Sequence, residues 1–261
     1  MLGKLMKYDL KKMGKTLIIF YIVSIVLSSI TRLINIGKNI QIVFIIGQVF
    51  AGITYSAIGS VLVNTFIHIL RVFINNFYKD ESYLTHTLPI KKSKLLLSKY
   101  LSSLILILCS VAVCFLSLFI MFYSPEFMQG FKMFIEMTVS GFNIPFGLII
   151  SLIILIIFAQ ICAMISMSFA AIVIANKSNH KRVLKGLLWF ALFYFSVMVD
   201  IVIATVIVFA IQGNLSELFA AQMNQTALIS VLIVGLIVYI LYAFLSYLIC
   251  QKLFKKGVNV D

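Results

Sequence analysis

Long apolar runs separated by short polar segments dominate the sequence. A continuous apolar run of about 20 residues is long enough to cross a bilayer as an α-helix. The second and fourth runs exceed the hydrocarbon core at about 1.5 Å per helical residue, so we expect them to tilt or to extend beyond it. The pattern predicts an all-α, polytopic membrane protein with six transmembrane helices, at residues 16–34, 42–70, 100–123, 147–175, 186–212 and 226–250.

The composition agrees with this prediction. Hydrophobic residues make up 62% of the 261 positions and charged residues 11%, whereas soluble domains carry about 25% charged residues. The net charge of +13 could indicate nucleic-acid binding, but the basic residues gather at the ends of the apolar runs, so we expect membrane lipid and no nucleic acid as partner. The four cysteines lie within or beside apolar runs without a Cys-x-x-Cys pair, so we expect neither a disulfide nor a metal site.

The placement of the basic residues predicts the orientation of the chain. Eighteen of the 21 Lys and Arg lie before the first run, between the second and third, between the fourth and fifth, or after the sixth. The opposite side has only Arg32, Lys38 and Lys132. The positive-inside rule therefore predicts that both termini and the polar segment after the second run are cytoplasmic.

The first fifteen residues are amphipathic. On a helix, the apolar side chains share one face and the lysines share another, which predicts an interfacial helix over residues 1–15 that lies in the headgroup region. The alternative is a basic flank that only sets the orientation. The apolar face contains Leu2, Leu5, Met6, Leu10 and Met13, and the basic face contains Lys4, Lys7, Lys11 and Lys15.

A dense polar segment, "YKDESYLTHTLPIKKSKLLLSKYL" at residues 78–101, separates the second and third runs. Asp80 and Glu81 suit the positive end of a short helix through Leu88, which Pro89 must end. Ser93 is the expected cap of the helix that follows. The short helix would expose aromatic, aliphatic and small polar side chains, as a docking surface for another protein does. The alternative is a plain connector.

The arrangement "YKDESYLTHTLPIKKSKLLLSK" resembles the cytoplasmic loop between the second and third spans in permease subunits of type-2 ATP-binding-cassette (ABC) exporters. In that family an acid, "YLT.TLP", a basic stretch and "SK" recur, after a basic amphipathic start and within a six-span plan. The resemblance implies that residues 78–99 form a coupling loop that docks into a cleft of a separate ATPase subunit. The implied docking residues are Asp80, Glu81, Tyr83, Leu84, Thr85, His86, Leu88 and Pro89.

The resemblance also implies the organisation of the whole protein. It implies a single transmembrane permease domain over residues 1–261, a second permease subunit that is identical or paralogous, and ATP and Mg bound by the partner ATPase. The expected location is a bacterial cell membrane. The family places a re-entrant helical pair between its fifth and sixth spans, whereas here the larger external segment is residues 124–146, between the third and fourth. The sequence therefore does not predict the structure of the external gate.

Motifs for catalysis are absent from the sequence. There is no Gly-x-x-x-x-Gly-Lys-Ser/Thr phosphate loop, so the chain is not expected to be the ATPase or to bind a cofactor itself. The three histidines, His68, His86 and His180, form no His-Glu-x-x-His motif, and no acids are paired within the spans. We therefore expect a transport subunit rather than an enzyme. The apolar spans favour an amphipathic or hydrophobic substrate, such as a peptide antibiotic or a lipid.

Two polar features lie within the predicted spans. Asp200 is the one acid near the middle of a span, and is interpreted either as a point on a substrate or proton path or as a structural acid bonded to Gln160 or Asn64. The second span carries small residues at four-residue spacing, which favours helix packing within the subunit or across a dimer, with pore lining as the alternative. This small-residue stripe consists of Gly52, Ser56, Ser60 and Asn64.

Two other classes of protein fit the apolar spans. One is a membrane immunity or sensor protein that binds a peptide without transporting it. The other is an ion-coupled carrier that uses Asp200, although such carriers usually show matched interrupted helices. An ATPase encoded beside this chain would favour the exporter over both.

Overall fold

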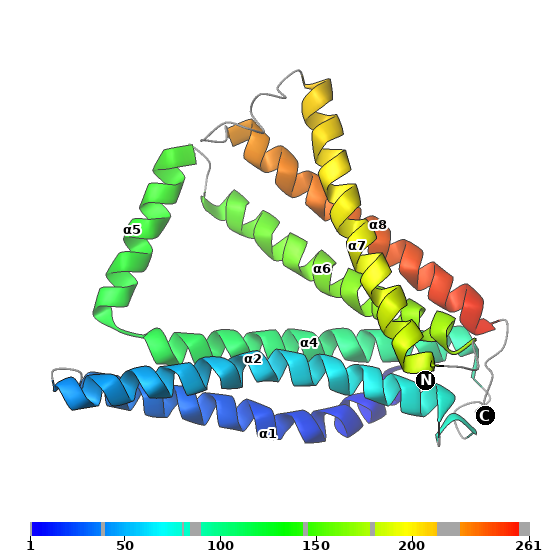
Figure 1. The fold of residues 1–261 in the computed structure, drawn as a ribbon, viewed down its shortest axis with the longest axis horizontal. Coiled ribbons are helices and arrows are strands. Elements are labelled where there is room, and N and C mark those ends of the chain that lie inside the picture. Colours follow the sequence, from blue (N-terminus) through cyan, green and yellow to red (C-terminus); the bar gives the residue numbers. More distant parts are fainter. Residues whose placement is uncertain are drawn as a thin grey trace. The chain divides into compact units, whose positions relative to one another are not determined.

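The computed structural model of the chain describes residues 2–37, 40–79, 81–83, 90–142, 146–177, 181–212 and 225–255. Its helices are drawn in Figure 1. The fold class predicted from the sequence is confirmed, because the elements of the described residues are all α-helical. They are α1 (Leu2–Ile36), α2 (Gln41–Tyr78), α4 (Lys92–Phe122), α5 (Pro125–Phe142), α6 (Phe146–Ala175), α7 (Arg182–Ile211) and α8 (Gln225–Lys255).

Six of these helices have the length and apolar composition needed to cross a membrane: α1, α2, α4, α6, α7 and α8. The prediction of six segments with the length and composition of membrane spans is therefore confirmed. The helices are longer than the apolar runs, because backbone hydrogen bonding continues into the polar flanks once a helix has formed. In particular, α1 joins the amphipathic start and the first span in one helix.

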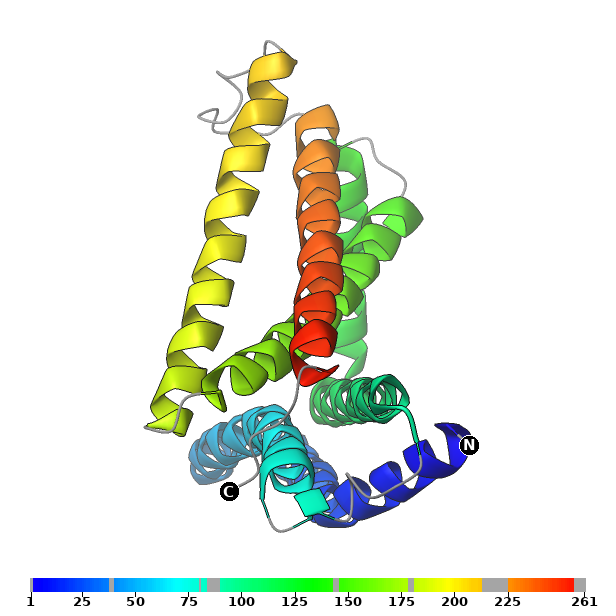
Figure 2. The ribbon, with the colours of Figure 1, turned by 90° about the vertical axis from the view of Figure 1, so that its right-hand side faces the viewer.

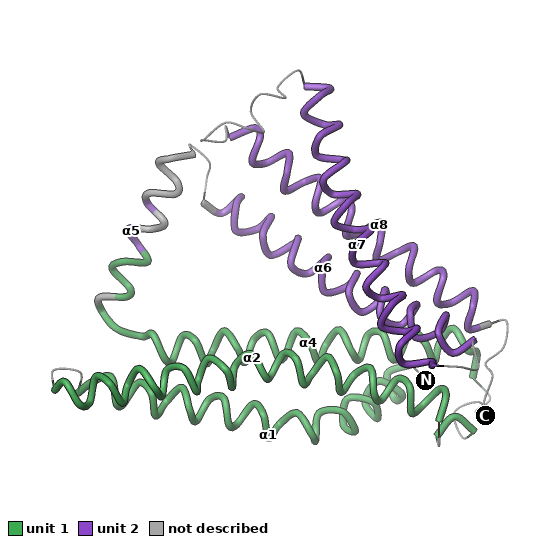
Figure 3. Tube along the Cα trace, viewed as in Figure 1, with its two compact units in different colours: residues 1–131 green, residues 132–261 purple. Residues whose placement is uncertain are grey.

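The chain forms two compact units, residues 1–131 and residues 132–261, coloured separately in Figure 3. Unit 1 contains α1, α2 and α4, and unit 2 contains α6, α7 and α8. The single permease domain expected over residues 1–261 stays a prediction.

In unit 1, hydroxyl side chains join the three long helices. Ser110 on α4 shares hydrogen bonds of 2.7 Å with both Tyr21 on α1 and Thr65 on α2. Further along, Thr31 on α1 and Thr54 on α2 share another bond of 2.7 Å. Small hydroxyl residues allow close approach of helix backbones and find their polar partners inside the bundle. This hydroxyl seam fixes how α1, α2 and α4 face one another.

The small-residue stripe predicted on the second span lies away from this seam. Gly52 and Ser56 are exposed, while Ser60 and Asn64 are half-buried. The polar side chains of the stripe bond to carbonyls of their own helix, as in the 2.9 Å bond from Asn64 to Ser60. The face of α2 that packs in unit 1 instead carries Thr54, Ile58, Val61 and Thr65. Packing of the stripe against another helix or a second subunit stays a prediction.

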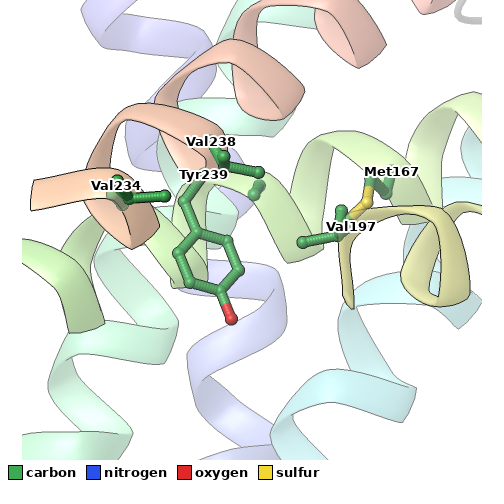
Figure 4. Close-up of a cluster of buried hydrophobic side chains, with 7 residues drawn as sticks. Met167, Val197, Val234, Val238 and Tyr239 are labelled. Atoms are coloured by element: carbon green, nitrogen blue, oxygen red, sulfur yellow. The ribbon is translucent and has the colours of Figure 1, made fainter. Parts of the chain in front are cut away.

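In unit 2, α6 packs against both α7 and α8. Small side chains on α6, Ala159 and Ala163, make room for larger residues of the neighbouring helices. Figure 4 shows the resulting cluster, with Met167 from α6 and Val197 from α7 close together. The α8 residues of the cluster are Val234, Val238 and Tyr239. This cluster in the core of unit 2 is therefore apolar.

The segment predicted to be external, residues 124–146, is largely helical. Ser124 caps α5, because the backbone N–H of Phe127 donates to the Ser124 Oγ at 3.1 Å. Pro125 then occupies the first helical position, where its missing N–H needs no partner. The ring of Phe127 stacks between Phe122 and Phe131, with centroid distances of 5.5 and 6.2 Å.

Candidate functional site

The candidate site lies at the end of unit 1 where α1 begins, α2 ends and α4 begins. We call this the proximal end of unit 1. In Figure 2, where α4 is seen nearly end-on, the first turns of α1 are seen from the side and run across this end. The interfacial position predicted for the first fifteen residues stays a prediction. The lysines of the basic face are exposed, whereas the apolar face is wholly or partly buried, most completely at Met13.

The predicted coupling loop leaves the end of α2 in a tight turn. Lys79 ends α2 in an extended conformation, and the N–H of Ser82 donates to the Lys79 carbonyl at 2.7 Å. Ser82 is buried, but the next side chain, Tyr83, is 75% exposed. An aromatic side chain of this size, held by a turn and uncovered, is available to a partner protein.

Only part of the predicted docking surface falls within the described residues. Glu81 and Tyr83 do, and the other predicted docking residues lie outside them: Asp80, Leu84, Thr85, His86, Leu88 and Pro89. The prediction that Ser93 caps the following helix is wrong. The N-cap of α4 is Lys91, without a side-chain hydrogen bond, so the helix starts before the serine is reached.

A buried ion pair joins α1 to α4 beside this turn. The Lys99 ammonium donates to the Asp9 carboxylate, and the Ser98 hydroxyl donates to the other Asp9 oxygen at 3.1 Å. The side chains of Lys99 and Asp9 are only 9% and 13% exposed. Charges removed from water to this extent are tolerated only when they are paired and hydrogen-bonded. The pair therefore fixes the register of α1 against α4.

Asn76, near the end of α2, extends this pair into a network. With its amide oriented so that both neighbours are satisfied, buried Asn76 accepts a hydrogen bond from Lys99 and donates one to Glu81. Glu81 in turn forms an ion pair with Lys12 on α1, in which both side chains are more than 40% exposed. One chain of polar contacts thus links the base of the predicted coupling loop to α1, α2 and α4. We call these five residues, Asp9, Lys12, Asn76, Glu81 and Lys99, the proximal network.

One feature of the sequence pointed to this network and was missed. Asp9 is the single acid among the first fifteen residues, and it falls on the apolar face of the amphipathic helix rather than on its basic face. An acid in such a position needs a buried cation as partner. The candidate cations were numerous, so the sequence did not single out Lys99. Chemically, the arrangement can hold three helices together and transmit a displacement of the loop to them.

The intramembrane acid belongs to unit 2. Asp200 lies near the middle of α7, as expected, but its side chain is exposed. It accepts a hydrogen bond from the hydroxyl of Tyr242 on α8. Of the two partners considered from the sequence, Asn64 donates to a carbonyl of its own helix, and Gln160 is half-buried on α6. The sequence could not reveal the pair, because it depends on how α7 and α8 are rotated against each other.

We expect loss of either member of this pair to weaken the contact between α7 and α8. Asp200→Leu and Tyr242→Phe should each lower the free energy of unfolding in mixed micelles by about 1 kcal/mol, and the double variant by no more than either alone. Asp200→Asn keeps an acceptor and should lose less stability, while changing any transport that depends on the charge. Thr205→Val, which removes a hydroxyl bonded only to its own helix carbonyl, is the control. Additive losses in the double variant would contradict a direct Asp200–Tyr242 interaction.

The proximal network and the exposed Tyr83 together form the candidate site, and both come from unit 1. The Asp200–Tyr242 pair is a second polar feature, confined to unit 2. Comparisons of the chain with known protein families, with curated proteins and with solved structures found no match.

Proposed function

We propose that this chain is the permease subunit of an ATP-driven ABC exporter. A separate ATPase subunit would dock on the coupling loop, residues 78–99, and supply the energy of ATP hydrolysis with Mg. Two permease subunits, identical or paralogous, would form the transport path for an amphipathic or hydrophobic substrate. In this proposal the proximal end of unit 1 faces the cytoplasm of a bacterial cell.

The observation that carries the proposal is the continuity between Tyr83 and the proximal network. A coupling element must present a surface to its partner and must also be stiff, or the partner's motion is lost in the loop. Tyr83 presents the surface, and two residues earlier in the chain Glu81 contacts both Asn76 and Lys12. A plain connector has no need of contacts to three helices at its base. The resemblance of "YKDESYLTHTLP" to exporter coupling loops supports the same function.

A photo-crosslinking experiment tests this proposal. A photoreactive phenylalanine analogue at Tyr83 should crosslink, in native membranes, to a protein that contains a phosphate-binding loop and hydrolyses ATP. The same analogue at Tyr123, an exposed tyrosine at the other end of unit 1, is the matched control and should not capture it. Equal capture from both positions, or capture from Tyr83 of proteins without nucleotide-binding motifs only, would contradict the proposal.

A further inference from the structure

A second polar site lies at the distal end of unit 1, where α1 ends, α2 begins and α4 passes into α5. A pocket of about 520 Å³ opens there between these four helices. This volume is typical of small-molecule sites. Its walls combine polar and aromatic side chains, among them Arg32, Asn35, Phe44, Gln48, Phe122 and Phe127. We call it the distal pocket.

The positively charged side chain of Arg32 is held in a defined position in the distal pocket. The guanidinium carbon of Arg32 lies 5.0 Å from the centre of the Tyr123 ring, which is within the range of a cation–π interaction. Arg32 directly follows Thr31, whose hydroxyl is fixed in the seam with Thr54. Among the side chains that the structure describes, no carboxylate forms an ion pair with Arg32. Stacking on a ring face leaves the in-plane N–H groups of the guanidinium available to an anion.

The backbone of α2 makes room for a second polar side chain. A Cβ added at Gly47 would lie 2.7 Å from the Asn35 Oδ1, so the amide can occupy its position only because this residue is glycine. Asn35 and Gln48 both line the pocket beside Arg32. Their amide N–H groups are neutral donors that complement the charged donor of Arg32. Together the three side chains suit an anionic group with several acceptor oxygens.

The rest of the pocket is apolar and continues into exposed apolar surface. Phe44, Phe122 and Phe127 are each partly exposed beside the polar residues. The neighbouring Leu33 and Ile36 on α1 are 68% and 72% exposed. On a helix that crosses a membrane, such side chains contact lipid, and an arginine near the end of the span lies at the level of the headgroups.

We propose that the distal pocket binds the phosphate headgroup of an anionic phospholipid. Arg32 contacts the phosphate oxygens, Asn35 and Gln48 donate to the headgroup, and an acyl chain lies along Phe44, Phe122 and Phe127. A bidentate contact to phosphate is the characteristic use of arginine, and lysine does not reproduce it. The exposed apolar side chains beside the pocket favour a lipid over a peptide carboxylate as the ligand. The site does not depend on the proposed transport function.

The test uses the full chain in micelles of neutral detergent, with native mass spectrometry to count bound lipids. Phosphatidylglycerol should bind more tightly than phosphatidylcholine, and Arg32→Met should weaken phosphatidylglycerol binding about tenfold or more, because a charge-assisted hydrogen bond is lost. Arg32→Lys should recover only part of this loss. Gly47→Ala should also weaken binding by displacing Asn35, although it leaves every charge in place. Lys132→Met, which removes a basic residue outside the pocket, is the matched control and should bind as the parent does.

Specific outcomes would overturn the proposal. Equal binding of the two lipids by the parent chain would remove the case for an anionic headgroup. Equal loss of phosphatidylglycerol binding in Arg32→Met and Lys132→Met would show that binding depends on net charge and not on the pocket. Displacement of phosphatidylglycerol by inorganic phosphate alone would identify an ion site, and displacement by an acidic amphipathic peptide would identify a peptide site. If Arg32→Met does not fold, Gly47→Ala and the two lipids decide the question, and parent-like binding by Gly47→Ala then counts against the pocket.

Discussion

Tyr83→Ala is expected to abolish stable association of the chain with the proposed ATPase subunit. An exposed aromatic residue at the centre of an interface typically contributes about 2 kcal/mol or more, which is a loss of about thirtyfold in affinity. Leu84→Ala, at the next predicted docking position, should deepen the loss. Co-purification of the ATPase and substrate-stimulated ATP hydrolysis are the measurements. Because the Tyr83 side chain is 75% exposed, its removal should leave the fold and membrane insertion unchanged.

The matched control for this variant is Tyr8→Ala. Tyr8 is 78% exposed and lies among the lysines of α1, outside the predicted docking residues. Tyr8→Ala therefore removes the same type of side chain as Tyr83→Ala from an equally exposed position. Retained ATPase binding and hydrolysis in Tyr83→Ala/Leu84→Ala would reduce residues 78–99 to a connector. Equal losses in Tyr8→Ala and Tyr83→Ala would show that the effect is not specific to the loop.

Lys99→Met is expected to destabilise unit 1 severely. The substitution leaves the Asp9 carboxylate buried without its cation, and breaking a buried pair in this way costs about 3–5 kcal/mol. The side-chain oxygen of Asn76 also loses the hydrogen bond that it accepts from Lys99. The measurement is the free energy of unfolding in mixed micelles, followed by the loss of helical circular dichroism. The chain should also fail to bind the proposed ATPase subunit, because the base of the predicted coupling loop is no longer held.

Two further variants separate the buried charge from charge in general. Lys12→Met removes a cation from the exposed pair with Glu81 and should cost at most about 1 kcal/mol. Asp9→Leu/Lys99→Met removes both buried charges together and should recover most of the stability lost in Lys99→Met. If Lys99→Met and Lys12→Met were equally mild, the proximal network would not hold the helices together. If the double variant were stable but uncoupled hydrolysis from transport, the network would serve coupling rather than stability.

The sequence alone determined the features that depend on local pattern. Length and hydropathy predict six membrane-spanning helices, because the backbone N–H and C=O groups of a segment that crosses lipid must find their hydrogen-bond partners within the protein, as they do in a helix. The period of the first fifteen residues predicted which side chains share a face, and that face is the one partly buried in the structure. The interruption between α2 and α4 was predicted in its position, since polar residues and Pro89 break the apolar pattern there.

The tertiary structure decided which residues of different helices meet. Asp9 and Lys99 are 90 positions apart, and their pairing depends on the rotation and register of α1 and α4, which no local pattern encodes. For the same reason, the sequence could not show that the face of α2 that packs within unit 1 carries Thr54 and Thr65, whereas the stripe from Gly52 to Asn64 lies on another face. Small residues mark both faces, and only the positions of the neighbouring helices distinguish them. The distal pocket likewise exists because four helices bring together side chains that each look unremarkable in their own segment.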